Sequence, residues 1–130
     1  MPGHFEFDSQ HKILLLVGEG HIEDPEILAV NDRIAAQVNR LRPSAGITDL
    51  SAVTKFDPSA DAMRSAARQP SPYPEETPRF IVAPVDHVFG LARMYELFGS
   101  RVNLKVVHSR REALAALGIQ NAKFEPVDSE

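Results

Sequence analysis

The stretch DHVFGLARMYE, residues 86–96, carries an acid, an imidazole, a guanidinium, a phenol and a second acid within eleven residues. Such groups perform acid–base catalysis only where they converge on one reacting atom. A helix turns by roughly 100° per residue, which places Tyr95 and Phe98 on the apolar side and Arg93 and Glu96 on the other. The polar groups therefore do not converge, and the stretch predicts a helix packed on a core rather than a catalytic site.

The outward side of this helix has a different composition. The same geometry directs Phe89, Arg93 and Glu96 outwards and places Leu97 beside Arg93. Arg93 and Glu96 are three residues apart, the spacing of a weak surface ion pair. Apolar residues next to an arginine are typical of interfaces. We therefore expect Phe89, Arg93, Glu96 and Leu97 to bind a partner protein or a second copy in a homodimer, the alternative being a solvated face.

The segment 18–24, GEGHIED, is a second place where chemistry is conceivable. If a strand continues through it, Glu19, His21 and Glu23 share one face and could present a metal. One histidine with two carboxylates is a weak ligand set, so we predict no metal site and interpret the segment as a polar strand end. A small enzyme that uses His21 or His87 with neighbouring carboxylates stays an alternative function.

The third candidate, residues 48–59, joins a strand end to the start of a helix. Free N–H groups at a helix start favour anions, but Asp49 and Asp57 bring negative charge that opposes a bound phosphate. A hydroxyl here could instead be phosphorylated, which would add charge and disturb the loop. Asp49, Ser51, Asp57 and Ser59 are therefore candidates for modification or partner binding, and simple capping polarity is the alternative.

The composition excludes several classes of protein. The chain of 130 residues is long enough for one domain with its own core, and it has no cysteine for a disulfide, a thiolate metal site or a nucleophile. A net charge of −4 argues against general nucleic-acid binding. No apolar run reaches the roughly 20 residues that span a bilayer, and no secretory signal is evident. We expect a cytoplasmic protein without membrane insertion, and no cofactor motif is present.

Hydrophobic patterns predict the elements that must position these side chains. Alternation over residues 4–8 and an apolar run over 12–17 predict a hairpin, and Asp24-Pro25 predicts the start of a helix. Further strands are expected over 46–50, 80–85 and 102–108, and further helices over 58–68, from 86 onwards and over 109–118. The order β-β-α-β-α-β-α-β-α implies an α/β fold with a central mixed, mostly parallel sheet and helices.

Residues 69–78 have four prolines in ten positions, which predicts a stiff exposed loop rather than a linker. Neither half of the chain is large enough to fold comfortably alone. We therefore expect a single domain over residues 1–130, with a core over about 5–118 and a loose C-terminal tail over 119–130.

At residues 49–57 the sequence resembles a known family. The motif DLSAV at 49–53, followed by Phe56-Asp57 and a short helix, resembles the STAS domains, named for sulphate transporters and anti-sigma-factor antagonists. FGLARMYE at 89–96 and REALAALG at 111–118 are similar to small stand-alone bacterial STAS-like proteins. The resemblance covers most of residues 5–118 and implies a STAS-like fold, which is shared with lipid-transfer domains of the CRAL-TRIO type.

The resemblance implies a non-enzymatic regulatory module that binds a partner protein, sometimes under the control of phosphorylation. In the family the modified serine directly follows the aspartate of the strand–helix loop, in a D-S-x-G motif. Here Pro58 follows Asp57, which argues against the standard phosphoswitch and leaves Ser59 or Ser51 as acceptors. The shared fold also permits a carrier or sensor of an apolar small molecule or lipid, which would need a cavity between the sheet and one helix layer.

Overall fold

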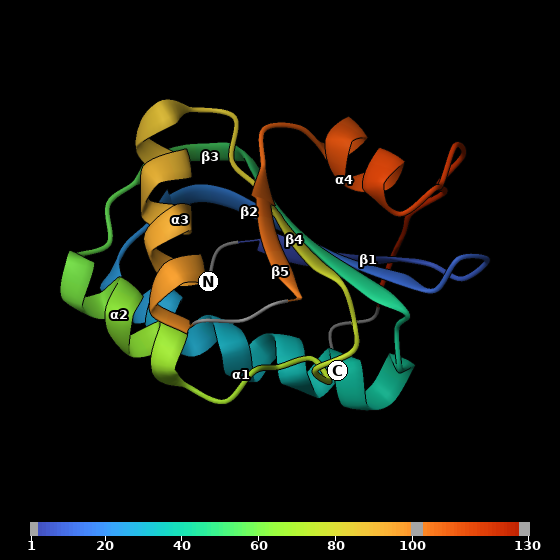
Figure 1. The fold of residues 1–130 in the computed structure, drawn as a ribbon, viewed down its shortest axis with the longest axis horizontal. Coiled ribbons are helices and arrows are strands. Elements are labelled where there is room, and N and C mark those ends of the chain that lie inside the picture. The colour runs from blue at the N-terminus through green and yellow to red at the C-terminus, as the bar shows by residue number, and fades with distance from the viewer. Residues whose placement is uncertain (1–2, 100–102, 128–130) are drawn as a thin grey trace.

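A six-stranded mixed sheet runs through the structure, a computed structural model that describes residues 3–99 and 103–127 (Figure 1). Its strands lie in the order β5-β4-β3-β2-β1-β6. Their bounds are Gly3–Asp8 for β1, Ile13–Ile22 for β2, Ala45–Phe56 for β3, Arg79–Val82 for β4, Leu104–Val107 for β5 and Glu125–Pro126 for β6. Strands β2 to β5 are parallel, whereas β1 is antiparallel to both β2 and β6. The predicted mixed α/β class is confirmed.

The four helices divide unequally between the two faces of the sheet. They are α1 (Asp24–Leu41), α2 (Ala60–Arg68), α3 (Asp86–Gly99) and α4 (Arg110–Ala116). Strands β2 to β5 follow one another in a single direction across the sheet, and right-handed crossovers therefore place α1, α2 and α3 on the same face. Helix α4 lies on the opposite face, and the chain then continues to β6 at the far edge (Figure 1). We call these the three-helix face and the α4 face.

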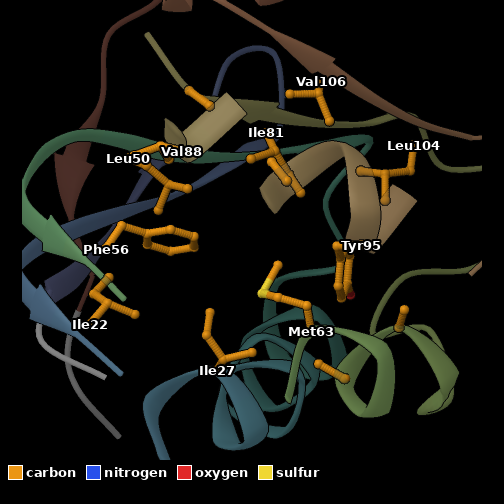
Figure 2. Close-up of a cluster of buried hydrophobic side chains, with 14 residues drawn as sticks. Ile22, Ile27, Leu50, Phe56, Met63, Ile81, Val88, Tyr95, Leu104 and Val106 are labelled. Carbon is orange, nitrogen blue, oxygen red and sulfur yellow. The ribbon is translucent and has the colours of Figure 1, made fainter. Parts of the chain in front are cut away.

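Each face of the sheet has its own hydrophobic core. The apolar run of β2 alternates between them, so Ile13 and Leu15 pack towards α4 whereas Leu14 and Leu16 pack towards α1. Between the sheet and α2–α3 lies a further cluster, which includes Ile22, Ile27, Leu50, Phe56, Met63, Ile81, Val88, Tyr95, Leu104 and Val106 (Figure 2). Strand β2 is therefore covered on both faces of the sheet.

Strands β2 and β3 extend further than the sequence pattern indicates. Strand β3 was expected to end at Leu50, but it continues to Phe56 because β2 also continues and pairs with it as far as Ile22. The register shifts between Val17 and Glu19 and again after Gly20, whose φ is +68°. The segment expected to be a strand–helix loop is therefore largely strand.

Two segments, one expected to be a stiff exposed loop and the other a loose tail, pack against the rest of the fold. In the Pro-rich segment 69–78, Tyr73 is buried against Gly46, where any larger side chain would overlap the phenol. Near the C-terminus, β6 pairs with β1, and Phe124 packs on the α4-face core. Only residues 128–130 of the expected tail lie outside the described part of the chain.

Candidate functional site

Helix α3 presents part of its expected contact face to solvent. Leu97 has 62% of its surface exposed, and Arg93 is exposed with its Nη1 2.7 Å from Glu96 Oε1, the expected ion pair. Phe89 differs from the prediction: it is partly buried against the three-helix core and stacks on the His108 ring at 4.2 Å. The first turns of α3 pack beside β5, which gives Phe89 a neighbour that helical spacing alone does not reveal.

The second difference on α3 is Phe98, which helical spacing assigns to the core. It is 37% exposed, and the guanidinium of Arg64 on α2 lies 4.9 Å from the centre of its ring. Such cation–π contacts are weakly favourable at exposed sites. Leu97 and Phe98 thus form an exposed apolar pair flanked by Arg64, Arg93 and Glu96, which we call the α2–α3 surface.

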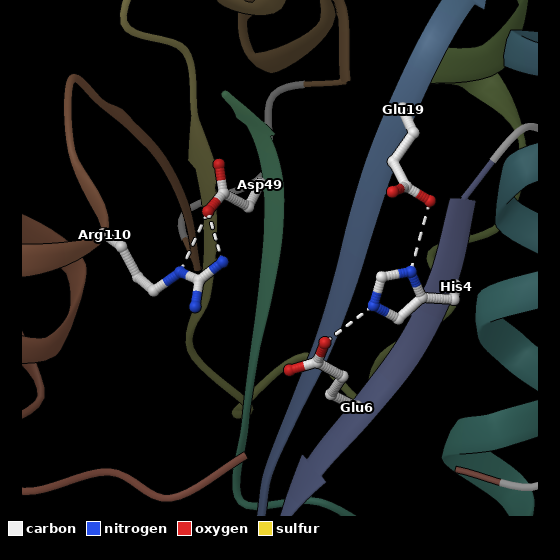
Figure 3. Close-up of polar contacts among 5 residues, drawn as sticks. All are labelled: His4, Glu6, Glu19, Asp49 and Arg110. Carbon is white, nitrogen blue, oxygen red and sulfur yellow. Dashed lines mark hydrogen bonds and ion pairs between the residues drawn. The ribbon is translucent and has the colours of Figure 1, made fainter. Parts of the chain in front are cut away.

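Asp49 and Ser51 lie on β3 rather than in a loop. Asp49 is buried on the α4 face, where its Oδ2 accepts a hydrogen bond from Arg110 Nε at 2.9 Å and lies 2.7 Å from Nη2 in an ion pair (Figure 3). The Ser51 hydroxyl donates to Asp49 Oδ1 at 2.5 Å. Asp49 therefore forms an ion pair with two nitrogens of Arg110, and this pair links α4 to the sheet.

Ser59 and Asp57 lie at the other end of this segment, beside α2. The Ser59 hydroxyl accepts from the N–H of Ala62 at 3.0 Å as the N-cap of α2 and donates to Asp24 Oδ2 at 2.9 Å. Asp57 is exposed, with Lys55 at 4.0 Å. A phosphate on Ser59 would lie against the Asp24 carboxylate, a repulsive neighbour. The strand residues between Ser51 and Ser59 keep the four candidates from forming one site.

Glu19, His21 and Glu23 do not form one cluster, because His21 pairs with Glu23 whereas Glu19 lies beyond the register shift that follows Gly20. Glu19 instead lies 3.2 Å from Nδ1 of His4, whose Nε2 is 2.6 Å from Glu6 (Figure 3). The hydrogen bond to Glu6, and to a lesser extent the one to Glu19, raises the pKa of His4. Within the described residues no group of three such side chains could hold a metal ion.

The two histidines of the alternative enzyme have ordinary partners. His21 lies 2.9 Å from Glu23 at the surface, and His87 Nε2 donates to the Phe56 carbonyl at 3.0 Å. His21 is on β2 and His87 on α3. Among the described residues, neither histidine is hydrogen-bonded to a side-chain hydroxyl that it could activate as a nucleophile.

The structure reveals one polar residue in the core that the sequence patterns did not single out. Arg79, at the start of β4, is only 3% exposed and lies between two rings, 5.6 Å from the centre of Tyr73 and 5.4 Å from that of Tyr95. Its Nη1 donates to the Tyr95 hydroxyl at 3.1 Å. No acid of the described chain pairs with it, and its buried Nε has no hydrogen-bond partner there.

A cavity of about 40 Å³ adjoins this arginine on the three-helix face. Arg79, Thr48 and Tyr95 contribute the polar part of its lining. The rest is apolar, from Ile27, Val30, Leu50, Phe56, Met63, Ile81 and Ala92. Figure 2 shows Phe56 and Met63 extending into the space between the sheet and the helices. This is the position in which the carrier hypothesis requires a cavity.

A chain of hydrogen bonds links the arginine to the three helices. The Tyr95 hydroxyl donates to Asn31 Oδ1 at 3.0 Å, and Asn31 Nδ2 donates to the Ala66 carbonyl at 3.0 Å and to Gln69 Oε1 at 2.9 Å. Asn31 is on α1, Ala66 on α2 and Tyr95 on α3. The polar groups around the cavity therefore hold the helix layer together.

Comparisons with known proteins leave the family open. No protein-family model matches the chain, and no curated protein matches it significantly. Within the described residues, no helix has the length and apolar character needed to cross a membrane.

Proposed function

We propose that the protein is a non-enzymatic regulatory module of STAS-like type that acts through protein–protein contact, with a second copy of the chain as the partner. The order of strands and helices and the motifs at 49–53 and 89–96 support the family. The scattered partners of His21 and His87 support a binding function over an enzymatic one.

The α2–α3 surface is the observation that carries this proposal. Leu97 and Phe98 are adjacent exposed apolar residues on a helix that also presents Arg93 and Glu96. Apolar and arginine side chains together are what interface cores contain. Around a two-fold axis beside α3, Leu97 would meet the same residue of the other copy, and Arg93 of each copy could face Glu96 of the other. Such a surface is self-complementary, as a twofold interface requires.

Light scattering on size-separated protein tests the proposal through Leu97→Asp. Wild type is expected to be a dimer, and the variant a folded monomer, because a carboxylate would have to be buried without a partner at the contact. Leu28→Asp is the matched control, since Leu28 is also exposed, at 41%, but lies on α1. The control should stay dimeric. A monomeric wild type, or a dimer that survives Leu97→Asp, would contradict the proposal. Phe89→Asp is unsuitable because Phe89 packs on the core.

The cavity beside Arg79 favours a second candidate function, the binding of a small molecule. It lies between the sheet and one helix layer, as a carrier or sensor with the shared fold would require. The chemistry of the occupant follows from the arginine.

A further inference from the structure

Arg79 carries a buried positive charge, and no acid among residues 3–99 and 103–127 forms an ion pair with it. A guanidinium keeps its proton at any physiological pH, so it cannot become neutral as a buried lysine can. The two tyrosine rings and the Tyr95 hydroxyl stabilise it in part. Elsewhere in the chain the same problem is solved by an acid, as Asp49 does for Arg110. For Arg79, the described residues provide no such acid.

The orientation of the guanidinium shows which part of it is unused. Tyr95 accepts from Nη1, whereas Nε, on the opposite edge of the group, is buried and lacks an acceptor among the described residues. The edge formed by Nε and Nη2 is one that binds a carboxylate through two parallel hydrogen bonds. A small anion placed there would fill the vacant hydrogen bond and balance the charge.

The cavity limits the size and character of that anion. One buried water needs about 10–15 Å³, so 40 Å³ accommodates a group of about three such units. Ile27, Phe56 and Met63 are among the apolar residues that line it. Contact with apolar side chains does not stabilise a strongly hydrated inorganic ion, whereas it does stabilise a short aliphatic chain that leaves water.

We propose that the interior beside Arg79 is a binding site for a short-chain monocarboxylate of the size of acetate or propionate. The carboxylate accepts from Arg79 Nε, and the alkyl end packs against Met63 and Phe56. This site is independent of the α2–α3 surface and holds whether or not the protein is a dimer.

Methyl NMR of methionine-labelled protein, titrated with sodium propionate, tests the site directly. Met63 lines the cavity and Met94 does not, so the chain contains its own reference signal. The Met63 methyl signal should shift and saturate while that of Met94 stays in place, and the Tm should rise with propionate concentration. Sodium chloride at equal ionic strength should give neither effect. No saturable shift, or an equal shift with chloride, would overturn the proposal.

Two variants test separately whether binding needs the charge of Arg79 and whether it needs the volume of the cavity. Arg79→Met should fold, because replacing an unpaired buried charge by an apolar group is tolerated, and should weaken propionate binding at least tenfold. Arg64→Met, which removes an arginine at the α2–α3 surface, is the control and should bind as wild type does. Ala92→Val keeps Arg79 and occupies the cavity from α3, and it should also weaken binding at least tenfold. If Arg79→Met does not fold, Ala92→Val decides, and unchanged affinity in either folded variant would refute the site.

Discussion

At the scale of single residues, Asp8 shows how this fold stabilises a buried charge. It is the last residue of β1 and is only 1% exposed. Burial alone would raise the pKa of this carboxyl group, but hydrogen bonds from the His11 N–H and imidazole and from the N–H groups of Lys123 and Gln10 outweigh it. The pKa is lowered to about 2. Among the described residues, Asp8 therefore has the charged and hydrogen-bonding partners that Arg79 Nε lacks.

Asp8→Asn should destabilise the protein more at neutral pH than at low pH. The folded pKa of about 2 lies below the reference value of 3.8, so the ionised carboxylate stabilises the fold above pH 4 and loses this effect as the pH falls from about 4 to 2. The linked free energy of unfolding is about 2 kcal/mol. Urea unfolding at pH 7 and pH 2.5 measures the difference. Asp57→Asn, at an exposed carboxylate, should change little at either pH, and an equal loss at both pH values for Asp8→Asn would contradict the linkage.

At the scale of elements, the Pro-rich segment depends on one glycine of β3. Gly46→Ala should displace Tyr73, because the added methyl group would overlap the phenol. Burial raises the pKa of Tyr73 to about 12, more than the nearby charge of Arg79 lowers it. Once displaced into water, this phenol should titrate near its ordinary pKa of about 10. Ultraviolet titration of the two tyrosines measures the change.

Gly90→Ala is the matched control for that titration. A methyl group at Gly90, on the exposed side of α3, would meet open space. It should leave the tyrosine titration unchanged while stabilising the helix by up to about 1 kcal/mol. If Tyr73 in Gly46→Ala still titrates near pH 12, the segment is not held by this contact.

Local signals in the sequence predicted most helices and strands, but not the contacts between them. The Asp24-Pro25 helix start, the apolar run of β2 and the Arg93–Glu96 spacing each depend on neighbours within four residues or on burial alone. The positions of Phe89 and Phe98 depend on which strand or helix lies beside α3, and helical spacing contains no such information. The length of β3 likewise depends on how far β2 continues beside it.

The candidate site was harder to predict because its main feature is a missing partner. The pattern RFIVA identifies a buried strand, and alternation puts Arg79 on the same face as Ile81. Whether an acid lies opposite depends on the packing of α1, α2 and α3. Tyr73 reaches the arginine only because Gly46 leaves space, a pairing across 27 positions of the chain that no local pattern records.

At the scale of the whole molecule, the topology assigns a structural role to the C-terminal segment. Three right-handed crossovers place α1 to α3 on one face of the sheet, so the other face is covered by α4 and the residues that follow it. Ile119 and Phe124 pack on that core, and β6 extends the sheet beyond β1. We therefore expect residues 119–127 to unfold together with the rest of the protein.

Deletion of residues 121–130 should lower the free energy of unfolding by at least about 2 kcal/mol, because it removes Phe124 and the pairing with β1. Urea unfolding measures this loss. Glu125→Ala, at an exposed position of β6, is the control and should have little effect. The deletion also removes the Lys123 N–H that donates to Asp8 at 2.9 Å. The losses from the deletion and from Asp8→Asn should therefore be less than additive in the combined variant. Full additivity would mean that the hairpin and the C-terminal segment are stabilised independently.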